Sequence, residues 1–84
     1  MQGTPVQEGD AVIIDARGLN CPLPVLRLRK GLRTVPAGAW VNLIATDRAA
    51  LKDVPAFCAA QGMEVGEVRE ADGVLTFCIR NIGA

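Results

Sequence analysis

The hydrophobic period of this chain changes from that of a strand to that of a helix and back, which limits the possible folds more than any other feature. Residues 11–15, AVIID, form a short apolar run rich in β-branched residues that ends at a Gly18 turn, and this predicts a buried strand. From Pro22 the apolar residues recur at helical spacing and predict a helix, which the sequence VPAG at 35–38 ends. Its apolar stripe consists of Val25, Leu28, Leu32 and Val35.

A second strand and a second helix repeat this order. Residues 39–46 alternate well enough for a strand. Thr46 or Asp47 has the residue type of a helix N-cap, and Gly62 stops the helix that follows. The face of the strand that should point to the core is formed by Val41, Leu43 and Ala45.

Pro55 lies too far inside the second helix to be a first-turn proline. It predicts either a kink or a restart of the helix with Asp53 as a second cap. The buried stripe of this helix is predicted to be Leu51, Val54 and Cys58, because they recur at helical spacing.

Residues 63–80 are predicted to form a hairpin of two strands. Asp72-Gly73 is a strong signal for a tight turn between them. Broken alternation predicts a bulge near Gly66. The inward side chains should be Leu75, Phe77 and Ile79, which leaves Thr76, Cys78 and Arg80 on the opposite face.

The element order is therefore β-α-β-α-β-β. Strands joined by helical crossovers are parallel, and a hairpin is antiparallel. We therefore expect an α/β fold, a two-layer sandwich in which two helices cover one face of a four-stranded mixed sheet. Eighty-four residues provide one core, so we expect a flexible tail at residues 1–10, a single domain at residues 11–84, and a monomer.

Composition argues against several classes of function. Nine basic and nine acidic residues give a formal net charge of +0, whereas nucleic-acid binders rely on neutralising phosphates, so no direct DNA binding is expected. No apolar run is long enough to span a bilayer, and the N-terminus has no features of a signal peptide. We expect a cytoplasmic protein with no membrane contact.

Three cysteines, no Cys-x-x-Cys pair and no histidine are poor grounds for a metal site or a disulfide framework. No metal and no cofactor are expected, and each cysteine should be a free thiol in a reducing compartment. Cys58 lies on an apolar helical stripe and is expected in the core. Cys78 is expected on the open face of the sheet, and its role stays open.

The segment Cys21-Pro-Leu-Pro is an unusual helix start. A residue before proline is pushed out of the α region, as an N-cap requires, and Pro22 suits the first helical position. Cys21 is therefore predicted to be the N-cap. Cysteine caps weakly, and Pro24 removes an N–H that a cap often binds. A helix with this start is less stable than one capped by serine or aspartate, which suggests that the Cys21 sulfur has a function other than capping.

At a helix start the sulfur should meet the positive end of the macrodipole, with Arg17 a few residues away. Such surroundings lower a thiol pKa from about 8.5 into the range of roughly 3.5–7.5. We therefore expect Cys21 to be a reactive thiolate. The alternative is that Cys21 is a small apolar residue that fills the loop.

The sequence DARGLNCPLPVLRLRK at 15–30 resembles the TusA/SirA-like family of small sulfur carriers, whose hallmark is Asp-x-x-Gly-Leu-x-Cys-Pro-x-Pro-x-Leu. The stretch at 46–62 also looks like the second helix of that family, whose fold agrees with the order above. The motif is matched by Asp15, Gly18, Leu19, Cys21, Pro22, Pro24 and Leu26.

The resemblance implies a sulfurtransferase in which Cys21 carries sulfur as a persulfide. The sulfur would come from a donor such as a cysteine desulfurase or a rhodanese-type protein and pass to an acceptor protein, for example for tRNA thiolation. A thiolate is nucleophilic enough for this without a histidine. Basic residues of the first helix would help to dock acidic partner surfaces: Arg27, Arg29, Lys30 and Arg33.

Two other functions stay open. The basic helix could bind RNA or a regulatory protein in a non-catalytic module, although 4% aromatic residues argue against stacking on single strands. Redox sensing would need Cys58 or Cys78 to lie close to Cys21 in space. Nothing in the sequence chooses among tRNA thiolation, molybdenum-cofactor synthesis, sulfur oxidation and selenium metabolism.

Overall fold

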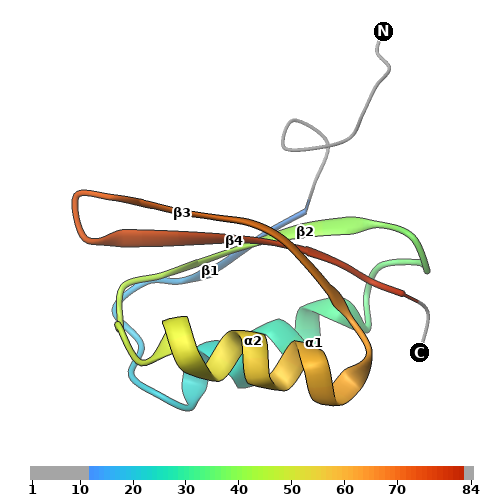
Figure 1. Ribbon diagram of the computed structural model, residues 1–84, viewed down its shortest axis with the longest axis horizontal. Coiled ribbons are helices and arrows are strands. Elements are labelled where there is room, and N and C mark those ends of the chain that lie inside the picture. The colour runs from blue at the N-terminus through green and yellow to red at the C-terminus, as the bar shows by residue number, and fades with distance from the viewer. Residues whose placement is uncertain (1–11, 83–84) are drawn as a thin grey trace, which may run out of the picture.

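The computed structural model describes residues 12–82, which fold in the predicted element order (Figure 1). The tail predicted at residues 1–10 lies outside the described residues, and the domain boundary at residue 11 stays a prediction. The elements are β1 (Val12–Ala16), α1 (Leu23–Leu32), β2 (Trp40–Ala45), α2 (Ala50–Gln61), β3 (Glu64–Ala71) and β4 (Val74–Arg80).

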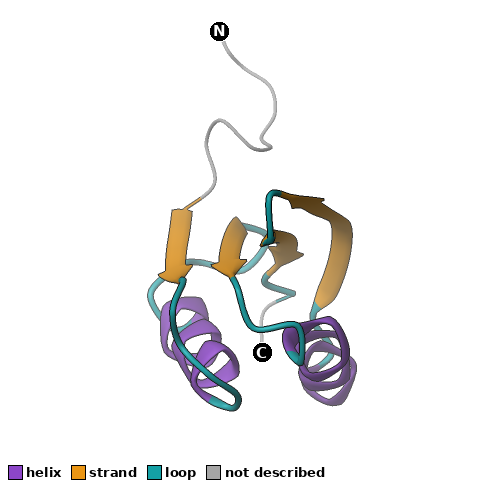
Figure 2. Cartoon of the chain, turned by 90° about the vertical axis from the view of Figure 1, so that its left-hand side faces the viewer, coloured by secondary structure: helices purple, strands orange, loops and turns teal. Residues whose placement is uncertain are grey.

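The strands form one four-stranded mixed sheet in the order β1-β2-β4-β3. β1 and β2 are parallel, whereas β4 is antiparallel to both β2 and β3. Both helices cover the same face of the sheet, and no helix of the described residues lies on the other face (Figures 1 and 2). The predicted α/β two-layer sandwich is confirmed.

The core lies between the sheet and the two helices. The central strands supply fully buried side chains that point inward as predicted: Val41, Leu43, Ala45, Leu75, Phe77 and Ile79. Side chains of both helices cover this apolar layer: Leu28 and Leu32 of α1, and Ala50, Val54 and Cys58 of α2. Burial of these side chains is the main favourable contribution to the stability of the fold.

The structure excludes one of the two alternatives predicted at Pro55, the restart of the helix, and differs from the prediction at Leu51. The helix continues through Pro55 without a restart, and the Asp53 N–H donates to the Ala49 carbonyl at 2.9 Å. Asp53 therefore lies inside the helix and caps no second one. Leu51 was predicted on the buried stripe but is 39% exposed. Ala50 lies on that stripe instead, together with Val54 and Cys58.

β1 was predicted to be buried and is only half buried. Ile14 and Ala16 face the helices, whereas Ile13 is 63% exposed because no described element covers the other face of the sheet. α1 lies very close to β1. A Cβ atom added at Gly31 would come within 2.3 Å of the Ile14 Cδ1 atom.

The hairpin forms as predicted. Asp72 has φ 53° and Gly73 has φ 79°, the left-handed pair that a two-residue turn of type I′ requires. The pairing register of β3 with β4 shifts between Val65 and Val68, which confirms the bulge near Gly66.

Candidate functional site

Cys21 lies in the loop between β1 and α1, and its side chain is exposed. The prediction of Cys21 as N-cap and Pro22 as first helical residue is wrong by one position. Pro22, which follows a cis peptide bond, is the N-cap, and no side chain caps the helix. The Leu23 N–H donates to the Asn20 carbonyl at 2.8 Å, which closes a turn over residues 20–23. Because Cys21 and Pro22 belong to this turn, the helix begins at Leu23, one residue later than predicted.

Two carboxylates, which the sequence indicated only as helix caps, contact Cys21. The Cys21 Sγ donates to Asp53 Oδ2 at 2.5 Å, and the Cys21 N–H donates to Asp47 Oδ2 at 2.6 Å. Asp53 lies in the first turn of α2. Asp47 lies in the loop after β2, where its Oδ1 also accepts from the Ala49 N–H at 3.0 Å. It was predicted as a possible N-cap of α2, but the N-cap is Ala49, two residues later.

A topological signal could have indicated the approach of Asp47 to Cys21. Loops that follow parallel neighbouring strands lie at the same edge of a sheet. The loop after the second strand therefore had to approach the loop that carries Cys21, and Asp47 is in that loop.

The pKa of the Cys21 thiol is raised, which contradicts the expected thiolate. The main cause is the hydrogen bond to the Asp53 carboxylate, followed by partial loss of hydration and by the negative charges of Asp53 and Asp47. All of these favour the neutral thiol. Arg17, which was expected to lower this pKa, is paired with Asp15 at 2.8 Å. The sulfur therefore has acidic neighbours.

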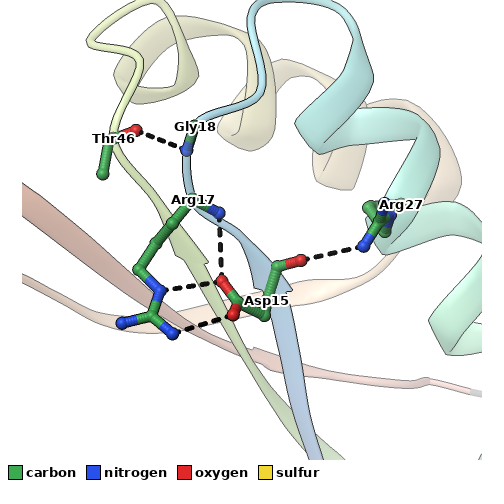
Figure 3. Close-up of polar contacts among 5 residues, drawn as sticks. All are labelled: Asp15, Arg17, Gly18, Arg27 and Thr46. Atoms are coloured by element: carbon green, nitrogen blue, oxygen red, sulfur yellow. Dashed lines mark hydrogen bonds and ion pairs between the residues drawn. The ribbon is translucent and has the colours of Figure 1, made fainter.

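The motif residues before the cysteine form a hydrogen-bonded support for its loop (Figure 3). The Asp15 carboxylate accepts from Arg17 through Nε at 2.9 Å, Nη2 at 2.8 Å and the backbone N–H at 3.1 Å. These contacts hold the pKa of Asp15 well below its usual range. The Gly18 N–H donates to Thr46 Oγ1 at 2.9 Å, and Arg27 Nη1 donates to the Asp15 carbonyl at 3.1 Å. The network joins β1, α1 and the loop after β2.

The surface beside Cys21 is apolar with a basic edge. Leu23 and Leu26 are 46% and 49% exposed, whereas Pro24 is buried and Leu19 packs partly against the core. A shallow depression of about 210 Å³ is lined by Leu19, Leu23, Leu26, Arg27 and Lys30. We call this surface the Leu23 face.

The other two predicted docking residues lie elsewhere. Arg29 and Arg33 border a depression of about 250 Å³ that α1 shares with the end of α2 remote from Asp53. The four basic residues therefore border two different depressions, two residues at each. The depression is lined by Arg29, Leu32, Arg33, Phe57, Gln61 and Met63.

The remaining cysteines differ from Cys21. Cys58 is fully buried, as predicted, and burial raises its pKa to about 11. Cys78 is half-buried on the sheet face opposite the helices. Within residues 12–82, no cluster of three or more His, Cys, Asp or Glu side chains could hold a metal ion, and neither helix is long and apolar enough to cross a membrane.

Comparison with known proteins assigns the chain to a family. The sequence profile of the family described as sulfurtransferase TusA matches residues 12–81, which includes every helix and strand. The chain belongs to the TusA family. The resemblance found in the motif around Cys21 is confirmed, and with it a role in sulfur transfer.

Similar proteins agree with this TusA assignment. The chain is 43% identical over 67 residues to the sulfur carrier protein TusA of Allochromatium vinosum, covering 80% of this chain and 88% of that protein. It is 41% identical over 68 residues to the sulfur carrier protein TusA of Pseudomonas putida, covering 81% and 85%. The crystal structure of a SirA-like protein from Desulfitobacterium hafniense has a TM-score of 0.72 at 30% identity, covering 82% of this chain and 95% of that one.

Proposed function

We propose that the protein holds sulfur as a persulfide on Cys21, takes it from a donor protein and delivers it to an acceptor protein. The exposure of Cys21 carries this proposal, because Cys58 is buried and Cys78 half-buried. The loop that presents Cys21 is supported from β1, α1 and the loop after β2. An exposed sulfur on a supported loop suits transfer between two protein surfaces.

The transfer needs no oxidant. The Cys21 thiolate attacks the outer sulfur of a donor persulfide, a new S–S bond forms on Cys21, and the S–S bond of the donor breaks. The donor cysteine leaves as a thiolate and keeps the electron pair of the broken bond. The second transfer repeats this exchange, with the acceptor as nucleophile and Cys21 as leaving group.

The partners that fit this chemistry are a cysteine desulfurase or a rhodanese-type protein as donor and a protein of sulfur metabolism, such as one serving tRNA thiolation, as acceptor. The Leu23 face gives such partners an apolar surface with a basic edge next to Cys21. A reducing cytoplasm would keep all three cysteines as the free thiols they are here.

Intact-mass spectrometry after incubation with a cysteine desulfurase and cysteine tests the proposal. The wild type and the Cys58→Ala/Cys78→Ser variant should each gain about 32 Da, the mass of one sulfur atom, which a thiol reductant removes. Cys21→Ser should gain nothing and should keep its unfolding midpoint, since the side chain is exposed. An adduct that persists in Cys21→Ser would exclude Cys21 as the carrier.

A further inference from the structure

We propose that Asp53 is a positioning residue that holds Cys21 as a hydrogen-bonded thiol in the free protein, and that the thiolate forms only when this carboxylate is neutralised or drawn away. The inference rests on the proposed function and concerns the control of the same sulfur. It assigns a task to a residue of α2 that lies 32 positions from Cys21 in the sequence.

The two carboxylates at Cys21 hold different atoms. Asp47 accepts from the Cys21 N–H and from the Ala49 N–H, so it fixes the backbone of the loop. Asp53 accepts from the sulfur itself at 2.5 Å. The Asp53 backbone is held inside α2 by its bond to the Ala49 carbonyl, so the helix, and not a mobile loop, places the carboxylate against the thiol.

The charges that face Cys21 from the elements around it are negative. α2 contributes Asp53, and the loop after β2 contributes Asp47. Two cations that could oppose them are engaged with Asp15: Arg17 binds its carboxylate, and Arg27 of α1 binds its carbonyl. Removing the proton from Cys21 would place a third negative charge beside two carboxylates, which agrees with the raised pKa of the thiol.

This arrangement has a functional consequence. A thiol reacts far more slowly than a thiolate with alkylating agents, oxidants and disulfides. The free carrier is therefore protected although its cysteine is exposed. A cationic side chain of a docked partner that binds Asp53 would remove the acceptor of the hydrogen bond, and the thiol proton would pass to water. Reactivity would then appear in the complex, where the sulfur is needed.

The test is the rate of Cys21 alkylation by iodoacetamide between about pH 5 and pH 10. The full chain carrying Cys58→Ala/Cys78→Ser is used, so that Cys21 alone is labelled, and the mass is followed with time. Asp53→Asn should lower the midpoint of the pH profile by about one unit, which raises the rate at pH 7 about tenfold. Asp53→Glu should restore a midpoint near that of the parent.

Asp47→Asn is the matched control, because it removes an equal charge from a carboxylate that binds the Cys21 backbone and not the sulfur. Its midpoint should move by less than half of the Asp53→Asn shift. Circular dichroism checks folding, and Asp53→Ser provides a second neutral variant should Asp53→Asn be unfolded. An unchanged or raised midpoint in the folded neutral variant, or an equal shift in Asp47→Asn, overturns the proposal.

The experiment separates this inference from the proposed function, since alkylation needs neither a sulfur donor nor an acceptor. A shifted midpoint with no sulfur loading would keep the role of Asp53 and reject the carrier function. Normal sulfur loading with an unshifted midpoint would keep the carrier function and reject the role of Asp53.

Discussion

At the scale of single residues, the surroundings of each cysteine decide its chemistry. Cys21 is exposed and its thiol donates a hydrogen bond to the Asp53 carboxylate. Cys58 is 0% exposed and lies within the apolar core. Both have a raised pKa, but from different main causes: a hydrogen bond to an anion at Cys21, and loss of hydration at Cys58. Cys58 therefore contributes to stability in a way that depends on pH.

The pKa of Cys58 predicts a loss of stability in alkaline solution. The folded pKa is about 11, above the unfolded value of about 8.5, so folding favours the protonated form. The contribution is fully present below about pH 8.5 and is lost as pH rises through the folded pKa. Between pH 8 and pH 10.5, the free energy of unfolding of the wild type should fall by about 2 kcal/mol more than that of Cys58→Ala.

Urea unfolding of the two proteins at both pH values measures this difference. Cys58→Ala should also be less stable at pH 8, because it leaves a cavity, but this constant loss does not change how the free energy of unfolding depends on pH. Parallel losses with rising pH would show that Cys58 does not titrate differently in the folded and unfolded chains.

At the scale of elements, the close approach of α1 to β1 fixes the base of the Cys21 loop. Gly31 of α1 lies directly over Ile14 of β1, and a Cβ there would meet Ile14 at 2.3 Å and 2.9 Å. Arg27 reaches from the same helix to the Asp15 carbonyl. Glycine at position 31 lowers helix propensity but permits this packing.

Gly31→Ala should therefore destabilise the protein. Alanine would stabilise an unobstructed helix by about 1 kcal/mol, but displacing the buried Ile14 side chain should give a net loss of about 1–2 kcal/mol. Ile14→Val removes the Cδ1 atom that lies closest. In that background Gly31→Ala should cost at least about 0.5 kcal/mol less, measured by urea unfolding as a double-mutant cycle. If the losses of stability from Gly31→Ala and Ile14→Val simply add, α1 can move away from β1 without a loss of stability, and the contact between them is not the cause.

The elements themselves were largely predictable from the sequence, because hydrophobic period and turn chemistry act locally. The Asp72-Gly73 turn and the inward row of β4 follow from these local rules. The start of α1 does not follow from these local rules. The Leu23 N–H bonds to the Asn20 carbonyl, and this turn competes with the predicted capping of the helix by Cys21. The contact between Cys21 and Asp53 depends on how α2 packs beside α1. The sequence therefore predicted an exposed Cys21 but not the carboxylate that raises the pKa of its thiol.

At the scale of the whole molecule, a formal net charge of +0 hides an uneven distribution. Two carboxylates contact Cys21, while Arg27 and Lys30 border the Leu23 face beside it. Exposed leucines with a basic edge are suited to a partner whose surface is apolar and acidic. We expect this face, and not the depression bordered by Arg29 and Arg33, to set the rate of transfer.

Charge reversal in matched pairs tests that expectation. Arg27→Glu/Lys30→Glu should slow sulfur transfer from a loaded donor by about tenfold at low salt, and the loss should shrink as salt screens the charges. Arg29→Glu/Arg33→Glu makes the same change in net charge and should cost much less.

The alkylation rate of Cys21 separates docking from chemistry in these variants. It should stay unchanged in Arg29→Glu/Arg33→Glu, which leaves the loop network intact. Arg27→Glu also removes a hydrogen bond to the Asp15 carbonyl, so Lys30→Glu alone shows how much of the loss is docking. Equal losses in the two pairs would mean that the overall charge of the carrier, and not the surface beside its sulfur, controls the encounter.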